Sequence, residues 1–180
     1  VPGGDLASAY TNVWAILAGM PVDRAALAER VVRDESLCPL TAFSTYFAWR
    51  ALEEAGRYDL AGELLRPWRD MLGAGLTTCP EVPDLVTTRS DCHAWSAAPL
   101  VEYCRGILGV RPAEPGYAAV GIEPTPAGLA FARGRVPLTR LDASAPPRFV
   151  RVDWRIDGRT FRLRAEVPQG LPCRVRLPGR

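Results

Sequence analysis

The hydrophobic period changes once along this sequence, and that change limits the fold more than any other feature. Through the first part, apolar residues recur every three to four positions, in segments that end at Gly or Pro. After the Pro- and Gly-rich segment 112–116 the period becomes two, as in strands with one buried face. We therefore predict an α + β chain with two separate domains, helical over residues 1–111 and strand-bearing over residues 112–180.

The first part predicts helices with short connections, the pattern of stacked antiparallel helical hairpins. Asp5 and Asp23 are candidate N-caps for the first two helices. Pro67 falls inside a helical pattern, so we expect a kink or break there, because proline has no amide donor. Several helices carry apolar residues on more than one side, which indicates part of a larger helical array. The expected segments are Leu6–Leu17, Asp23–Val31, Pro39–Ala55, Leu60–Leu72 and Trp95–Leu108.

The second part predicts an all-β module, a small antiparallel β-sandwich. Residues 150–156 and 160–167 alternate apolar with charged side chains, and Asp157-Gly158 between them is a strong hairpin signal. Such alternation gives each strand one buried and one solvated face, as in antiparallel sheets. The expected strands span 117–123, 129–136, 149–156, 160–167 and 173–177.

Composition and charge argue against several classes of function. All 22 basic residues are Arg and the net charge is only +2, so we expect no nucleic-acid partner. Without a long apolar run or a leader-like segment, we also expect no membrane partner. The sequence opens without Met, and we expect that sequence upstream of it is missing. It contains no phosphate-binding loop or dinucleotide fingerprint, so we expect no cofactor.

The cysteines are irregularly spaced and form no C-x-x-C pair, so we expect no metal site. We expect most of them to be small buried thiols, which suits a reducing compartment and favours the cytoplasm. A disulfide between Cys79 and Cys92 is the alternative for that pair.

Polar and chain-stiffening residues concentrate in residues 76–95, in a break between two helical patterns. This stretch contains a proline-flanked Glu81, the only histidine, His93, and Trp95. Functional groups are often carried on loops that a rigid scaffold positions. A positioned Glu81 can act as a general base toward water, or it can be a surface charge or a helix partner. Trp95 is either a core residue or a sugar platform, and it is the best candidate for a platform among the tryptophans because it lies beside the loop.

His93 also has two interpretations: it faces a cleft, or it is satisfied by a backbone carbonyl and has no catalytic role. Ser90 could pair with His93, but no G-x-S-x-G elbow is present, which argues against a serine hydrolase. Ser90 or Asp91 is better explained as a cap of the following helix. We expect core positions for three other tryptophans, Trp14, Trp49 and Trp68.

The segments Gly-Leu-Thr-Thr-Cys-Pro-Glu at 75–81 and Arg-Ser-Asp-Cys-His-Ala-Trp-Ser at 89–96 resemble the closing part of the catalytic domain of bacterial α-L-rhamnosidases, glycoside hydrolase family 78. Similar pieces follow the family's order, so the resemblance covers nearly the whole chain. It implies the C-terminal half of an (α/α)6 barrel in residues 1–111, followed by a C-terminal β-sandwich in residues 112–180. The further pieces are 16–19, 56–61, 109–117 and 120–124.

The resemblance also implies inverting hydrolysis of terminal α-L-rhamnosyl linkages, in which one carboxyl group protonates the leaving oxygen and another activates water. The family's base falls on Glu81 and its pocket histidine on His93. Pro80 stands where many members have Trp before that Glu, so the pocket wall and the accepted sugar can differ.

The family's acidic cluster has no match in this sequence. The resemblance therefore implies a chain that is inactive alone, a rhamnose-containing glycoside or oligosaccharide as ligand, and a missing N-terminal part of the same protein as partner. Two other functions remain open: a non-catalytic carbohydrate-binding or scaffolding relative, and an (α/α)6 enzyme for another sugar.

Overall fold

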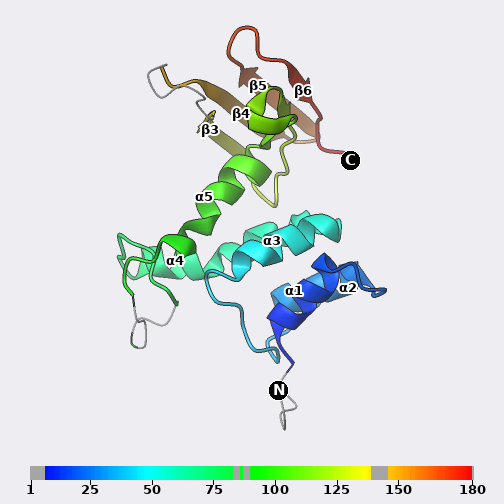
Figure 1. Cartoon of the computed structure of the whole chain (residues 1–180), viewed down its shortest axis with the longest axis vertical. Helices are drawn as coiled ribbons and strands as arrows, with labels where there is room; N and C mark the ends of the chain where they lie inside the picture. Colours follow the sequence, from blue (N-terminus) through cyan, green and yellow to red (C-terminus); the bar gives the residue numbers. More distant parts are fainter. Residues whose placement is uncertain (1–6, 83–85, 87–89, 139–145, 180) are drawn as a thin grey trace. The chain divides into compact units, whose positions relative to one another are not determined.

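The computed structural model describes residues 7–82, 86, 90–138 and 146–179 and divides the chain into two compact units (Figure 1). Unit 1 is Val1–Pro99 and unit 2 is Leu100–Arg180, so their boundary falls within helix α5 (Ala98–Glu102). Helices before strands is the order that the sequence predicts, and the structure confirms it. The division into domains at residues 111 and 112 stays a prediction.

Unit 1 consists of short helices, and Pro67 breaks one of the expected segments as predicted. A 3-10 helix precedes it, and Pro67 itself lies in the first turn of the next α-helix, where its missing amide donor is not needed. The elements of unit 1 are α1 (Ala9–Leu17), α2 (Arg24–Arg33), α3 (Thr45–Glu54), η1 (Tyr58–Leu65), α4 (Arg66–Gly73) and η2 (Ala94–Ala97).

The N-caps of the first two helices agree with the sequence at one position and not at the other. The Asp23 carboxylate accepts a hydrogen bond from the Ala26 amide at 3.0 Å and caps α2, as predicted. Helix α1 is capped by Ser8, whose hydroxyl accepts from the Tyr10 amide at 3.2 Å. Asp5 lies outside the described residues, and the later start of α1 moves the cap to Ser8.

Two buried tryptophans organise the core of unit 1, in agreement with the sequence. Trp49 on α3 and Trp68 on α4 have ring centroids 5.6 Å apart, and both are nearly inaccessible to solvent. Each indole N–H has a partner, because a buried donor left without one is costly. Trp49 donates to the Ala61 carbonyl at 3.1 Å, and Trp68 donates to the Ser96 carbonyl at 2.7 Å.

Unit 2 begins within α5, passes through the π-helical turn η3 (Tyr103–Ile107) and continues as two three-stranded sheets (Figure 1). One sheet has the order β3-β4-β5 and is antiparallel throughout. The predicted hairpin is confirmed, although Asp157 ends β4 and the two-residue loop is Gly158-Arg159. Its strands are β3 (Phe131–Pro137), β4 (Phe149–Asp157) and β5 (Thr160–Glu166).

The second sheet departs from the expected antiparallel pairing. It has the order β1-β2-β6, in which β1 pairs with β2 antiparallel but β2 pairs with β6 parallel. Strand β1 was not predicted, because its three residues follow a helical pattern and are too few to show a period of two. These strands are β1 (Val110–Pro112), β2 (Val120–Ile122) and β6 (Cys173–Val175).

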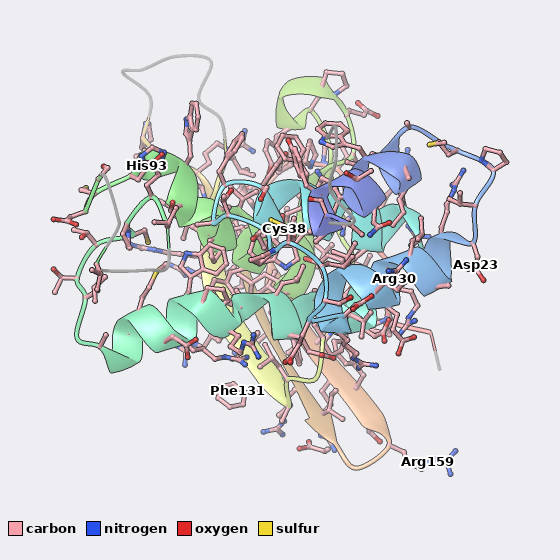
Figure 2. All side chains as sticks on the ribbon, turned by 90° about the horizontal axis from the view of Figure 1, so that it is seen from below. Asp23, Arg30, Cys38, His93, Phe131 and Arg159 are labelled. Atoms are coloured by element: carbon pink, nitrogen blue, oxygen red, sulfur yellow. The ribbon has the colours of Figure 1, made fainter. Side chains whose placement is uncertain are left out.

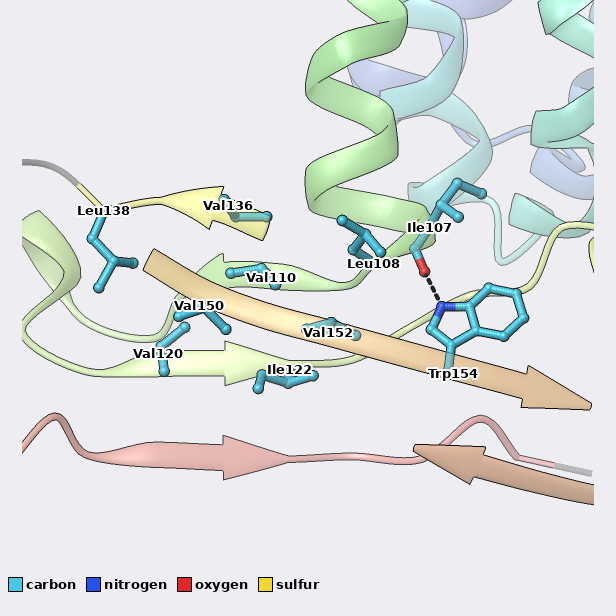
Figure 3. Close-up of a cluster of buried hydrophobic side chains, with 10 residues drawn as sticks. All are labelled: Ile107, Leu108, Val110, Val120, Ile122, Val136, Leu138, Val150, Val152 and Trp154. Carbon is cyan, nitrogen blue, oxygen red and sulfur yellow. Dashed lines mark hydrogen bonds between the residues drawn. The ribbon is translucent and has the colours of Figure 1, made fainter. Parts of the chain in front are cut away.

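Apolar side chains from both sheets form the core of unit 2 (Figure 3). Trp154 is fully buried on β4, and its indole N–H donates to the Ile107 carbonyl at 2.8 Å. This bond ties the end of η3 to the middle of the antiparallel sheet. Strands β1, β2 and β4 contribute buried side chains to the cluster, namely Val110, Val120, Ile122, Val150 and Val152.

Candidate functional site

The loop after α4 doubles back on itself, so that residues 78–81 lie beside residues 90–93. The Glu81 amide donates to the Ser90 carbonyl at 2.9 Å, and the His93 amide donates to the Cys79 carbonyl at 2.8 Å. The Thr78 hydroxyl donates to the Asp91 carbonyl at 2.5 Å. These bonds cross between two segments about ten residues apart in sequence, and they bring Glu81 and His93 onto one short, paired piece of backbone.

Glu81 sits on a well-held part of this loop. Its side chain is half-buried, its amide is bonded across the loop, and the preceding Pro80 is fully buried. Proline fixes its own φ, so a buried Pro80 limits how the backbone can enter Glu81. Pro83, the second proline that flanks Glu81 in the sequence, lies outside the described residues.

His93, which is labelled in Figure 2, immediately precedes η2. Its ring meets the Trp95 ring edge-on, with centroids 5.7 Å apart. Its ring makes no hydrogen bond within the part of the chain that the structure describes, which argues against the reading of a histidine satisfied by a backbone carbonyl. A half-buried imidazole on a fixed backbone can donate or accept one hydrogen bond at each ring nitrogen.

Trp95 has 65% of its surface exposed and packs on Phe43, the two ring centroids lying 4.8 Å apart at an interplanar angle of 34°. The contact extends along α3 to Phe47 and from there to Trp14 on α1, at 5.5 and 5.1 Å. We call these four residues the aromatic face. Trp14 and Phe43 are 43% and 37% exposed, so a continuous apolar surface leads away from His93.

Two hydrogen bonds hold the backbone of His93, Trp95 and Ser96 in place. The Trp68 indole holds the Ser96 carbonyl, one residue beyond Trp95, so the core of unit 1 anchors η2 directly. The Ser96 amide in turn donates to the His93 carbonyl at 2.9 Å. The site residues therefore belong to a loop, but the backbone that carries His93 and Trp95 is fixed from the core side.

Three expectations from the sequence are wrong at this site. Neither Ser90 nor Asp91 caps the following helix, because η2 begins only after His93 and has no side-chain cap. Trp14 is not a core residue, since it packs on the outer aromatic contacts of α1 and α3.

The third error concerns the thiols, which are not mostly buried. Cys38, Cys92 and Cys173 are exposed, and Cys79 and Cys104 are intermediate. All are free, including the Cys79 and Cys92 that the alternative would have joined. They lie in loops, at the start of a short strand and in a π-helical turn. At such positions no helical or strand period places the side chain on a buried face.

The sequence did not single out Phe43 as part of the site. Phe43 and Phe47 are four residues apart, and that spacing by itself places them only on one stripe of a helix. Their contact with Trp95 depends on where the later loop returns, and no spacing in the sequence reports that return.

This chain is similar to known proteins in both sequence and fold. Residues 109–180 match the family described as "Bacterial alpha-L-rhamnosidase C-terminal domain". A family 78 rhamnosidase of Bacillus sp. GL1 superposes with a TM-score of 0.82 at 32% identity, over 97% of this chain and 19% of that one. The chain belongs to the α-L-rhamnosidases of glycoside hydrolase family 78. The resemblance read from the sequence is thereby confirmed.

More distant solved rhamnosidases share the fold. The native α-L-rhamnosidase of Aspergillus terreus matches at 22% identity with a TM-score of 0.76, over 96% of this chain and 22% of that one. The Streptomyces avermitilis α-L-rhamnosidase, solved with L-rhamnose, matches at 24% with a TM-score of 0.70, over 93% and 18%. This rhamnosidase-family chain thus spans about a fifth of the length of its solved relatives. Curated protein sequences give no match.

Two classes of feature are absent from the described residues of this rhamnosidase-family chain. Within residues 7–82, 86, 90–138 and 146–179, no group of three His, Cys, Asp or Glu side chains is placed to hold a metal ion. No helix in the same ranges has the length and apolar character needed to cross a membrane.

Proposed function

We propose that this chain is the base-bearing C-terminal portion of an inverting α-L-rhamnosidase. The observation that carries the proposal is the placement of Glu81 and His93 together on one paired loop, in a chain 32% identical to a family 78 rhamnosidase over almost its whole length. In finer detail, residues 1–111 form part of an (α/α)6 barrel and residues 112–180 form a β-sandwich domain. The free thiols suit a reducing compartment, which favours the cytoplasm.

The role proposed for Glu81 is that of general base. An inverting glycosidase needs one carboxylate to take a proton from water as the water attacks the anomeric carbon, and a carboxylic acid on the other side to protonate the leaving oxygen. The two groups stand roughly 6.5–9.5 Å apart so that the water fits between base and sugar. Glu81 supplies the first group, and a carboxyl group outside this sequence supplies the second.

His93, Trp95 and Phe43 form the wall on which the sugar rests. Imidazole nitrogens can hydrogen-bond sugar hydroxyls, while an exposed indole offers a flat apolar surface to the C–H face of a pyranose ring. The His93–Trp95 and Trp95–Phe43 contacts support this assignment, because each ring fixes the orientation of the next. Pro80 stands where many members of the family have Trp before the base, so the wall and the accepted sugar can differ there.

The test of the base is Glu81→Gln in a longer polypeptide that carries this chain together with its upstream sequence. The amide keeps the size of the side chain but cannot accept a proton, so kcat for an aryl α-L-rhamnoside should fall by about 10³-fold or more, with little change in KM. The matched control is Glu54→Gln, which removes an exposed carboxylate at the end of α3 and should leave kcat unchanged.

Two results would contradict the assignment. Near-normal turnover by the Glu81→Gln variant removes Glu81 from the role of base. Binding of rhamnose without any hydrolysis by the unaltered longer protein favours a non-catalytic carbohydrate-binding relative, and hydrolysis of a different glycoside alone favours another sugar specificity.

A further inference from the structure

One face of the antiparallel sheet in unit 2 is covered by arginines. Along β3, β4 and β5, alternate side chains enter the core, and the intervening ones point to the opposite side because successive residues of a strand face opposite ways. We call this second side the arginine face. It carries Arg133, Arg135, Arg151, Arg155, Arg162 and Arg164, together with Asp153, Asp157 and Glu166.

The arginine face holds more positive charge than the whole chain does. Its six arginines and three carboxylates leave a surplus of +3, whereas the net charge of the sequence is +2. The rest of the chain is therefore slightly negative, and the positive field is concentrated on one surface. Such concentration raises the local density of anions and speeds their association.

The carboxylates on this face hold the guanidinium groups in position without neutralising them. Asp157 contacts Arg155 at 3.1 Å and Arg162 at 3.2 Å, so one carboxylate pairs with two guanidinium groups. Glu166 is likewise shared by two arginines, which together hold the pKa of its carboxyl group below the ordinary value, with the hydrogen bond from Arg151 as the main cause. Each guanidinium has five N–H donors. The ion pairs among the described residues of this face occupy only a few of these donors, and the others can bind a ligand.

Two arginines at the centre of β3 are the least paired of the set. Arg133 approaches Asp153 only to 4.0 Å and is 82% exposed, and the Arg135 guanidinium lies 4.9 Å from the Phe149 ring centroid. Both line an open hollow of about 780 Å³. At the end of the sheet near Arg159, Phe131 adds a ring that is 71% exposed (Figure 2).

We propose that the arginine face binds an acidic polysaccharide, one whose sugars carry carboxylate groups. Guanidinium groups bind carboxylates through two parallel hydrogen bonds, and Phe131 and Phe149 offer apolar surface to sugar rings. The three carboxylates of the face can accept hydrogen bonds from sugar hydroxyls. They also repel any anionic polymer, and most strongly the densely charged phosphate backbone of a nucleic acid. The choice of a glycan rests on the proposed function, since the substrate of a rhamnosidase is itself a glycoside.

The test is affinity electrophoresis of the 180-residue chain in gels containing polygalacturonate, dextran or double-stranded DNA at low salt. Polygalacturonate should retard the chain, and neutral dextran should not. The double variant R133Q/R135Q should bind polygalacturonate about tenfold more weakly, because two exposed charge contacts are lost. The control R66Q/R69Q removes the same charge from α4 in unit 1 and should bind as the unaltered chain does.

A second variant separates geometry from charge and remains informative if R133Q/R135Q fails to fold. R133K/R135K keeps both charges but loses the planar fork, so its affinity should fall between those of the unaltered chain and the glutamine variant. Circular dichroism checks the fold of each protein.

Several results would overturn the proposal: no retardation by polygalacturonate, stronger retardation by DNA, equal loss in R66Q/R69Q, or full affinity in R133K/R135K. Because binding is measured without hydrolysis, polygalacturonate binding in a protein that cleaves no rhamnoside would uphold the arginine face and reject the proposed catalysis.

Discussion

At the scale of single residues, glycine is required most strictly at Gly109, where η3 turns into β1. Its φ is +76°, and a Cβ placed there would overlap the backbone of Glu123 and Pro124. The Glu123 amide donates to the Gly109 carbonyl at 2.9 Å, so the two segments cannot move apart without loss of that bond. Gly128 has a similar φ of +82°, but apart from its chain neighbours no described residue has an atom within 4 Å of the Cβ position.

This pair gives a prediction about stability. Gly109→Ala should lower the free energy of unfolding by about 3 kcal/mol, the sum of a left-handed backbone cost and overpacking against Glu123. Gly128→Ala should cost about 1 kcal/mol, because only the backbone term applies. Urea unfolding followed by circular dichroism measures both, and equal losses in the two variants would contradict the close approach at Gly109.

At the scale of elements, an ion-pair network joins α2 to η1. Arg33 reaches Glu63 and Glu29, each at 2.7 Å, and Arg57 also contacts Glu29 at 3.2 Å. Hydrogen bonds from Arg57 and Arg33 lower the pKa of Glu29, and the bond from Arg33 lowers the pKa of Glu63. These groups are exposed, so solvent and salt weaken the contribution of the network to stability. That contribution is best identified by its dependence on pH.

The sign of that dependence follows from the lowered pKa values. A carboxyl group whose pKa is lower in the folded state stabilises the fold above its ordinary value of about 4.5, and this contribution disappears as the pH falls through the lowered value. Arg33→Gln should therefore lower Tm by about 2–3 °C at pH 7 and leave it unchanged near pH 2. Thermal melts at both pH values measure the difference.

The control for the network is Arg24→Gln, which removes one charge from the other end of α2. Arg24 makes no ion pair in the described parts of the chain, so its effect on Tm should be the same at both pH values. A pH-independent effect of Arg33→Gln would show that the network contributes nothing.

At the scale of the whole molecule, the chain spans about a fifth of its solved relatives, and unit 1 leaves several large aromatic side chains exposed. An apolar surface of this kind on a monomer indicates a binding surface or an interface. Both suit the proposed position of unit 1 as part of a larger barrel, in which the aromatic face would line the substrate site or meet neighbouring helices.

The corresponding prediction concerns activity. The 180-residue chain alone should hydrolyse an aryl α-L-rhamnoside no faster than buffer does, because we propose that the acid that protonates the leaving oxygen lies outside this sequence. The longer polypeptide should be active under the same conditions, and release of the aryl group measures both. Turnover by the short chain that Glu81→Gln abolishes would mean that the acid lies within these residues.

The sequence alone determined the order of the elements, the break at Pro67, the hairpin after β4 and the family. These depend on local period, turn chemistry and ordered motifs, which act over a few residues at a time. It also marked Glu81, His93 and Trp95 as candidates, and the role of each stays a prediction.

Tertiary structure decided which of these residues meet. The pairing of residues 78–81 with 90–93 joins the two ends of one loop, and the stacking of Trp95 on Phe43 and the parallel pairing of β2 with β6 join segments far apart in the chain. Tertiary structure likewise decided the exposure of Trp14 and of three thiols. A hydrophobic period shows which face of a helix or strand is apolar. Only the packing of the elements determines which side chains of that face remain exposed to solvent.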